Sequence, residues 1–132
     1  MTENLNVLCQ NQLKIVSKLN LYSEEFINRL LHPDNEIIVN FPVTLENGET
    51  KMFKGYRIQH NNLLGPYKGG LRFHPICHLD ECKALACWMT IKCSLQNLPL
   101  GGGKGGIKFN PREYSKKDLE SISKKFSRSL SK

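Results

Sequence analysis

The sequence predicts a single mixed α/β domain, in which a mostly parallel sheet begins with an antiparallel hairpin and is flanked by helices. Apolar residues occupy every second position from Ile37 to Leu45, and Asn47-Gly48 then supplies a tight turn. The stretch from Leu79 to Asn97 is apolar nearly all round, which is typical of a helix enclosed in the core. Predicted strands and helices alternate around it, and 132 residues suffice for one such core but not for two.

Two helices are predicted before the hairpin. Residues Asn4 to Leu19 carry a ragged helical stripe of apolar side chains. Ser23 is a suitable N-cap for a second helix, because the two glutamates that follow it favour the positive end of a helix dipole. His32-Pro33 is expected to end this helix, since the residue before a proline avoids the helical conformation.

Three further strands and a final helix follow the opening strand. The return strand of the hairpin is expected to continue to Ile58, with a β-bulge near Gly55. The segment "GGLRF" predicts a short third strand, and Gly106 to Phe109 a fourth. Ser115 and Asp118 have the spacing of an N-terminal helix cap. Residues expected to face inward from this last helix are Leu119, Ile122 and Phe126.

Net charge and hydropathy exclude several functional classes. The formal net charge is +7, and the tail from Arg112 to Lys132 holds seven basic residues against three acidic ones. We interpret this tail as a solvated helix face and not a nucleic-acid site, because no aromatic platform or recognition motif accompanies it. No apolar run approaches the length of a membrane span, and the amino terminus lacks a secretory pattern. We therefore expect a cytoplasmic protein.

The cysteines favour buried apolar roles. They are odd in number and contain no C-x-x-C pair, and four of the five lie in or beside one predicted helix. "HPICHLDEC" offers two histidines and two cysteines as a conceivable zinc set, but their spacing fits no usual zinc layout, so we predict no metal site. The five cysteines are Cys9, Cys77, Cys82, Cys87 and Cys93.

The run "GGGKGG" invites a nucleotide-binding interpretation that its context does not support. Gly101, Gly103 and Gly106 have dinucleotide-fingerprint spacing, but that motif follows a strand and opens a helix, whereas this run does the reverse. Gly105 stands where a phosphate-binding P-loop needs serine or threonine. A flexible surface loop is the alternative, and the flanking apolar residues favour a packed one.

Three lysines form the candidate site. Lys68 and Lys104 each lie on a glycine-lined turn, and we expect these turns at the ends of neighbouring strands, where ligands bind in open α/β sheets. Lys92 lies in the apolar helix, where a single lysine usually extends to the surface unless other cations meet it at an anion site. Clustered, desolvated ammonium groups have lowered pKa values, so one could act as a general base while the others hold carboxylates.

Three blocks of the sequence resemble the amino-terminal domain of the Glu/Leu/Phe/Val dehydrogenase family, most closely its glutamate dehydrogenase branch. The blocks are "GYRIQHNNLLGPYKGGLRFHP", "ECKALACWMTIKCSL" and "LPLGGGKGGIKFNP", in the family's order and spacing. The resemblance is firm from about Ile37 to Leu130 and looser before it. Motifs this long are far more specific than the glycine spacing rejected above.

The resemblance implies a role for each lysine. Lys104 matches the catalytic lysine, which helps to activate the water that attacks an iminium intermediate. Lys92 matches the lysine that holds the α-carboxylate of the substrate. Lys68 matches the lysine that pairs with the side-chain carboxylate of glutamate, and Met89 lies near the substrate without selecting it. The glycines implied to line the site are Gly69, Gly70, Gly102, Gly103 and Gly105.

The family reaction is the NAD- or NADP-dependent oxidative deamination of glutamate to 2-oxoglutarate and ammonia. The resemblance places the catalytic aspartate and the nicotinamide-binding Rossmann domain downstream of residue 132. We therefore expect residues 1–132 to form one substrate-binding and oligomerisation domain, to bind glutamate or 2-oxoglutarate, and to be inactive and without cofactor alone.

The origin and role of such a chain remain open at this point. It fits a truncated product, an excised fragment or a split subunit, and we expect a homo-oligomer or co-assembly with a dehydrogenase subunit. The alternative function is a non-catalytic assembly or ligand-binding module that associates with an intact dehydrogenase. The exposed edge of the opening hairpin is a candidate pairing surface.

Overall fold

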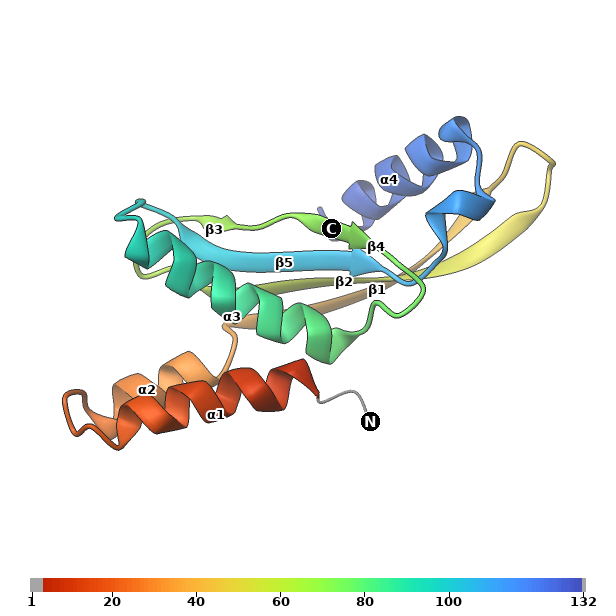
Figure 1. Cartoon of the computed structure of the whole chain (residues 1–132). Coiled ribbons are helices and arrows are strands. Elements are labelled where there is room, and N and C mark those ends of the chain that lie inside the picture. The colour runs from red at the N-terminus through yellow and green to blue at the C-terminus, as the bar shows by residue number, and fades with distance from the viewer. Residues whose placement is uncertain (1–3, 132) are drawn as a thin grey trace.

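The computed structural model describes residues 4–131 and shows one sheet with α3 on one face and α4 on the other (Figure 1). Lys132, the last residue of the basic tail, lies outside the described residues. No helix in the described range is long and apolar enough to cross a membrane. The elements in chain order are α1 (Leu5–Ser17), α2 (Glu24–Leu31), β1 (Asn35–Thr44), β2 (Thr50–Asn61), β3 (Tyr67–Lys68), β4 (Leu71–Phe73), α3 (Leu79–Leu95), β5 (Gly101–Ile107), the 3-10 helix η1 (Pro111–Glu113) and α4 (Lys116–Leu130).

The sheet is mixed, as predicted, but parallel pairing does not dominate it. Its strand order is β1-β2-β5-β3, with β4 also paired to β5. β1 pairs with β2, and β2 with β5, in long antiparallel registers, whereas the parallel partners β3 and β4 have two and three residues. Parallel pairing is confined to β3 and β4 against β5, because the chain reverses direction at both ends of β2 and α3 then carries it back to a parallel β5.

The predicted helix caps are confirmed. The Ser23 hydroxyl accepts a hydrogen bond from the Phe26 amide at the start of α2, and the Ser115 hydroxyl accepts one from the Asp118 amide at the start of α4. α3 ends at Leu95, two residues earlier than predicted. Asn97 then adopts a φ of 52°, the left-handed conformation that ends many helices.

The predicted β-bulge is wrong in its position. Gly55 stays in register with Val39, and the irregularity lies further on, between Gln59 and Asn61 where β2 meets β5. The glycine at position 55 has a packing role instead, because a Cβ there would lie 2.7 Å from Cδ2 of Phe126. The absence of a side chain at Gly55 makes room for the aromatic ring of Phe126 of α4.

Two apolar clusters hold helices against opposite faces of the sheet. On one face, the α4 side chains Ile122 and Phe126 are fully buried against Phe41, Phe53 and their neighbours, as predicted for the inward face of this helix. Loss of one such phenylalanine typically costs about 3–5 kcal/mol. On the other face, Ala86 and residues around it hold α3 against β2 and β5.

α3 is sandwiched, as its apolar composition predicts. One side of it meets the sheet, and the other meets α1 and α2, which lie as a pair on its outer side (Figure 1). Ala84 and Cys87 of α3 pack against Cys9 and Leu13 of α1. α3 therefore forms the middle layer, and the residues on its exposed flanks are the ones free to meet a ligand.

Candidate functional site

The glycine run forms the strand β5 and not a loop. The sequence predicted a strand only from Gly106, whereas the structure begins it at Gly101, between β2 on one side and β3 and β4 on the other. A Cβ at Gly102 would overlap Thr90 of α3 and lie 2.5 Å from the Ala86 carbonyl oxygen. At Gly106 it would lie 2.5 Å from Sγ of Cys77. Glycine is required here because α3 packs directly on the backbone of the strand.

Lys104 is the one residue between Gly101 and Gly106 that is not glycine. It pairs with Ile58 across the ladder and is half-buried. Because side chains alternate along a strand, Lys104 shares the α3-covered face with Gly102 and Gly106. Its Nζ lies 3.7 Å from the point that a Cβ on Gly70 would occupy. The lysine therefore extends along the face of the sheet toward the segment between β3 and β4.

Lys68 lies on β3, which pairs with the same edge of β5 as β4 does. Its partner in the parallel ladder is Gly102, two residues from Lys104 on the same face of the sheet. Its side chain is exposed. Both lysines were expected on turns at strand ends. Lys68 is the last residue of β3, before Gly69 and Gly70, whereas for Lys104 the expectation is wrong, because Lys104 lies within β5.

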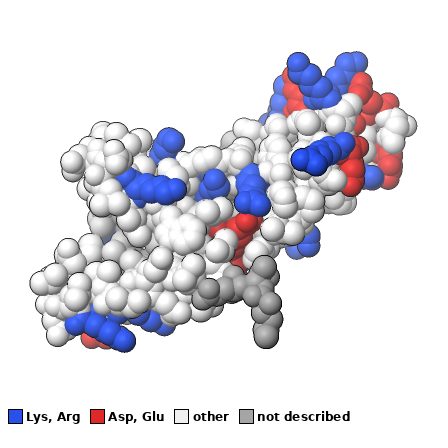
Figure 2. Space-filling model, viewed as in Figure 1, with Lys and Arg blue, Asp and Glu red and all other residues white. Residues whose placement is uncertain are grey.

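Lys92 and Met89 lie on the flank of α3 that faces β3 and β4. On the opposite flank, Lys83 forms an ion pair of 2.7 Å with Glu36 of β1, so that flank faces β1. Lys92 follows Lys83 by nine residues, about two and a half helical turns, so it lies on the opposite flank, and Met89 is its neighbour at a spacing of three residues. Met89 is half-buried and Lys92 exposed. Figure 2 shows basic side chains gathered over β3, β4 and β5 beside α3.

The three lysines share one further property. Within the part of the chain that the structure describes, no carboxylate oxygen lies within 4 Å of the ammonium groups of Lys68, Lys92 or Lys104, while five other cations form ion pairs. The nearby cation Arg72 is among the paired ones, at 3.2 Å from Glu81. An ammonium group without a carboxylate partner, beside bare backbone, is what an anionic ligand requires.

Arg57 is a residue of this region that the sequence analysis missed. Its Nη1 donates a hydrogen bond of 3.3 Å to the Gly69 carbonyl oxygen from the α4 side of the sheet, and burial lowers its pKa. A Cβ on Gly69 would overlap the carbonyl oxygen of Gly103, so Arg57 holds the glycine segments where they are closest. No local signal in the sequence predicts this contact.

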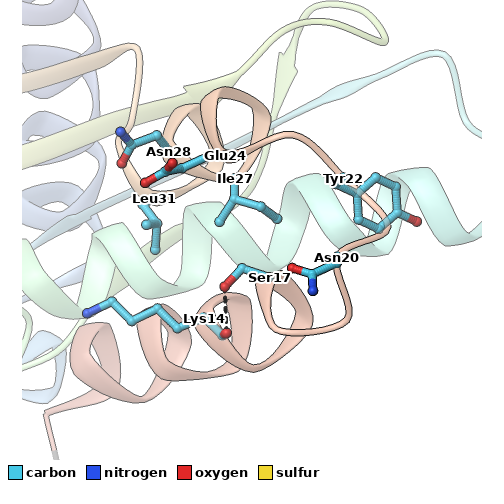
Figure 3. Close-up of a pocket in the computed structure, with 8 residues that line it drawn as sticks. All are labelled: Lys14, Ser17, Asn20, Tyr22, Glu24, Ile27, Asn28 and Leu31. Carbon is cyan, nitrogen blue, oxygen red and sulfur yellow. Dashed lines mark hydrogen bonds between the residues drawn. The ribbon is translucent and has the colours of Figure 1, made fainter.

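The two clefts described next lie elsewhere. One, of about 350 Å³, lies between α1 and α2 and is lined mostly by polar side chains, together with Ile27 and Leu31 (Figure 3). The other, of about 270 Å³, is an apolar groove between α2, the end of β2 and α3, with Asn61 and Thr90 at its wall. Neither includes Lys68, Lys92 or Lys104. The candidate site is therefore defined by its cations and not by the volume of a cavity. The residues of the first cleft are Lys14, Ser17, Asn20, Tyr22, Glu24, Ile27, Asn28 and Leu31.

The cysteines and histidines do not assemble a metal site among the described residues, where no group of three or more potential ligands lies together. All five cysteines are buried, as predicted, and none is in a disulfide. His60 is also buried, between α2 and α3, and its ring nitrogens contact the Leu30 carbonyl oxygen at 2.9 Å and the Thr90 hydroxyl at 2.8 Å. Burial lowers the pKa of His60.

The sequence is similar to a known protein family and to several of its members. Residues 33–132 match the family described as Glu/Leu/Phe/Val dehydrogenase, dimerisation domain. The chain is 44% identical over 131 residues to the catabolic NAD-specific glutamate dehydrogenase RocG of Bacillus subtilis. This alignment covers 98% of this chain and 31% of that protein. It is 50% identical over 97 residues to a glutamate dehydrogenase of Thermotoga maritima. This alignment covers 74% of this chain and 23% of that protein.

Solved structures show the same similarity. Glutamate dehydrogenase from Peptoniphilus asaccharolyticus superposes with a TM-score of 0.93 at 40% identity, covering 97% of this chain and 32% of that one. The hetero-hexameric glutamate dehydrogenase from Thermus thermophilus, in its leucine-bound form, superposes with a TM-score of 0.92 at 31% identity, covering 98% and 31%. The chain thus spans between 23% and 32% of the length of these relatives and solved structures.

Proposed function

Because this chain belongs to the Glu/Leu/Phe/Val dehydrogenase family, we propose that it forms the substrate-binding and assembly part of a glutamate dehydrogenase. The observation that supports this most is the placement of Lys68, Lys92 and Lys104 on β3, α3 and β5, on one side of the molecule and without carboxylate partners in the described range. A small molecule with two carboxylates matches three cations in such an arrangement.

Each lysine has a proposed role. Lys92, on the flank of α3, holds the α-carboxylate of glutamate or 2-oxoglutarate. Lys68, on the edge strand, pairs with the side-chain carboxylate. Lys104 is the catalytic lysine and helps to activate water at the carbon that carries nitrogen. Its half-buried position under α3 excludes part of the solvent, which strengthens its interaction with an anion. Met89 packs beside the ligand.

The polypeptide of residues 1–132 is proposed to bind substrate without turning it over. Relatives of this chain are described as NAD-specific, which supports NAD as the cofactor of the family. A dinucleotide fold needs a glycine turn between a strand and a helix, whereas these glycines form β5 inside the sheet. Hydride transfer therefore requires a nicotinamide-binding domain in addition to the elements described.

The role of Lys68 can be tested by calorimetry on this polypeptide. Wild type is expected to bind glutamate more tightly than norvaline, which has a methyl group in place of the side-chain carboxylate. Lys68→Ala should lose about tenfold or more in affinity for glutamate and little for norvaline, because one charge-assisted contact is removed. Lys125→Ala, an exposed lysine of α4, is the matched control and should leave both affinities unchanged. Equal affinities of wild type and Lys68→Ala for glutamate would contradict the assignment.

A second candidate function, that of an assembly module, is favoured by the apolar end of the molecule. Large apolar side chains are exposed on the α1–α2 connection, the β2–β3 loop and the end of α3, which lie at the same end of the molecule (Figure 1). Patches of this kind mark interaction surfaces. β1 also ends the sheet and offers an unpaired edge. The exposed residues are Ile15, Leu19, Leu21, Tyr22, Leu63, Leu64, Ile91, Leu95 and Leu98.

Sedimentation velocity tests the assembly function. The wild-type chain is expected to self-associate as its concentration rises, and Leu95→Glu should shift the distribution toward monomer, because a charge is then desolvated in the contact. Met52→Glu is the matched control, since Met52 is similarly exposed, 67% against 74% for Leu95, but lies on the hairpin. A wild-type chain that sediments as a monomer throughout would rule against this function.

A further inference from the structure

Cys77 and Cys82 form a buried pair of thiols beside β5. Their sulfur atoms are 3.9 Å apart, and the two residues are 0% and 1% exposed. Cys82 lies in the first turn of α3, and Cys77 lies just before the helix, with its sulfur over the bare backbone of Gly106. The two sulfurs are in van der Waals contact, and a disulfide needs them to approach to about 2 Å.

The surroundings make the two thiols unequal. The pKa of Cys77 is lowered, first because the Cys82 thiol donates a hydrogen bond to it and further by the charges of Arg72 and Lys104, while burial and Glu81 oppose this. The pKa of Cys82 is raised, because it keeps the shared proton and because it is buried. The remaining titratable neighbour is Tyr56, whose pKa is raised by burial. Cys77 is therefore the thiol that ionises first and reacts as a nucleophile.

We propose that Cys77 and Cys82 are an oxidation site at which a peroxide converts the pair into an intrachain disulfide. The Cys77 thiolate attacks one oxygen of hydrogen peroxide, the O–O bond breaks, and Cys77 becomes a sulfenic acid as hydroxide leaves. The Cys82 sulfur then attacks the Cys77 sulfur, the S–O bond breaks, and a second hydroxide leaves. The two thiol protons convert both hydroxides to water. Two thiols lose two electrons, and the peroxide gains them.

The start of α3 supplies a route for the oxidant. His78, the N-cap residue, makes no side-chain hydrogen bond to the first turn of the helix, so this end opens more readily than a capped one. Ile76 and His78 are exposed on either side of Cys77. Closing the disulfide draws the Cys77 sulfur toward α3 and away from Gly106, two residues from Lys104.

Peptide mapping after oxidation tests the proposal independently of any ligand. The folded chain is treated with hydrogen peroxide, quenched, unfolded in iodoacetamide and digested with trypsin. The peptide Phe73–Lys83 contains both cysteines and no others. We expect it to be lighter than its reduced form by two hydrogen atoms and unalkylated, and dithiothreitol should restore two alkylation sites. The peptide Cys93–Lys104 is the internal control and should stay alkylated, because Cys93 is buried and is not in a disulfide.

Variants separate the two steps. Cys82→Ser should leave Cys77 as a sulfenic acid that dimedone traps, whereas Cys77→Ser should leave Cys82 reduced and alkylated. Cys93→Ser should form the disulfide as wild type does. The same peroxide treatment of the chain unfolded in guanidinium shows that the reagents can join the pair. If the unfolded chain then forms the disulfide while the folded wild type yields only doubly alkylated Phe73–Lys83, the proposal is wrong.

Discussion

At the scale of single residues, the missing side chains matter as much as the lysines. The five glycines between positions 101 and 106 leave a strand so bare that α3 rests on its backbone, and Lys104 is the one long side chain among them. On the reverse face, Arg57 supports the Gly69 carbonyl oxygen. Position and charge of the candidate site thus depend on where Cβ atoms are absent.

The packing requirement at Gly102 can be measured. Gly102→Ala is expected to lower the free energy of unfolding by about 1–3 kcal/mol or more, because the added methyl group overlaps Thr90 and cannot be accommodated without moving α3. Gly70→Ala is the matched control, because its Cβ would meet nothing closer than the Lys104 Nζ at 3.7 Å. Urea unfolding of both variants gives the comparison. Equal stabilities would show that α3 does not rest on β5 as described.

At the scale of elements, α3 connects the layers. It meets the sheet on one side and α1 on the other, and His60 of β2 joins it to α2 through contacts with Thr90 and Leu30. The Leu30 carbonyl oxygen can only accept, so Nε2 of His60 carries the proton and donates it. This neutral ring is the form that burial favours, which couples the packing of three elements to pH.

A pH dependence of stability follows. Burial holds the pKa of His60 below its unfolded value of about 6.5, so the unfolded chain binds more protons between the two values. The contribution of His60 to stability is present above about pH 6.5 and is lost as the pH falls toward the folded pKa. Urea unfolding at about pH 7.5 and about pH 5.5 should therefore show a loss that is smaller in His60→Gln. The exposed His32→Gln is the control and should lose stability as wild type does.

The sequence predicts correctly those elements that depend on residues close together in the chain. The hairpin around Asn47-Gly48 and the caps at Ser23 and Ser115 depend on neighbouring residues, and the structure confirms them. The extent of β5 and the dominance of antiparallel pairing depend on contacts between distant segments, such as that of Gly102 with Thr90. The contact of Arg57 with Gly69 likewise has no local signal. The roles of the three lysines rest on family resemblance and stay predictions.

At the scale of the whole molecule, charge and apolar surface are separated. Basic side chains gather over β3, β4 and β5 (Figure 2), whereas large apolar side chains are exposed on the α1–α2 connection and the end of α3. Two distinct surfaces suit two distinct tasks, the binding of a small anion and association with another protein. The chain spans 31% of the length of the Bacillus subtilis relative.

The binding of 2-oxoglutarate to the lysine face is tested most directly by an amide NMR titration of the 132-residue chain. Glycine amides resonate apart from most others, so those of Gly69, Gly70 and the strand β5 report on the proposed site with little overlap. On addition of 2-oxoglutarate, their shifts and those of the Met89–Lys92 turn should change together and saturate along one binding curve. Saturating changes confined to the α1–α2 cleft of Figure 3 or to α4, with the glycines unmoved, would contradict the account.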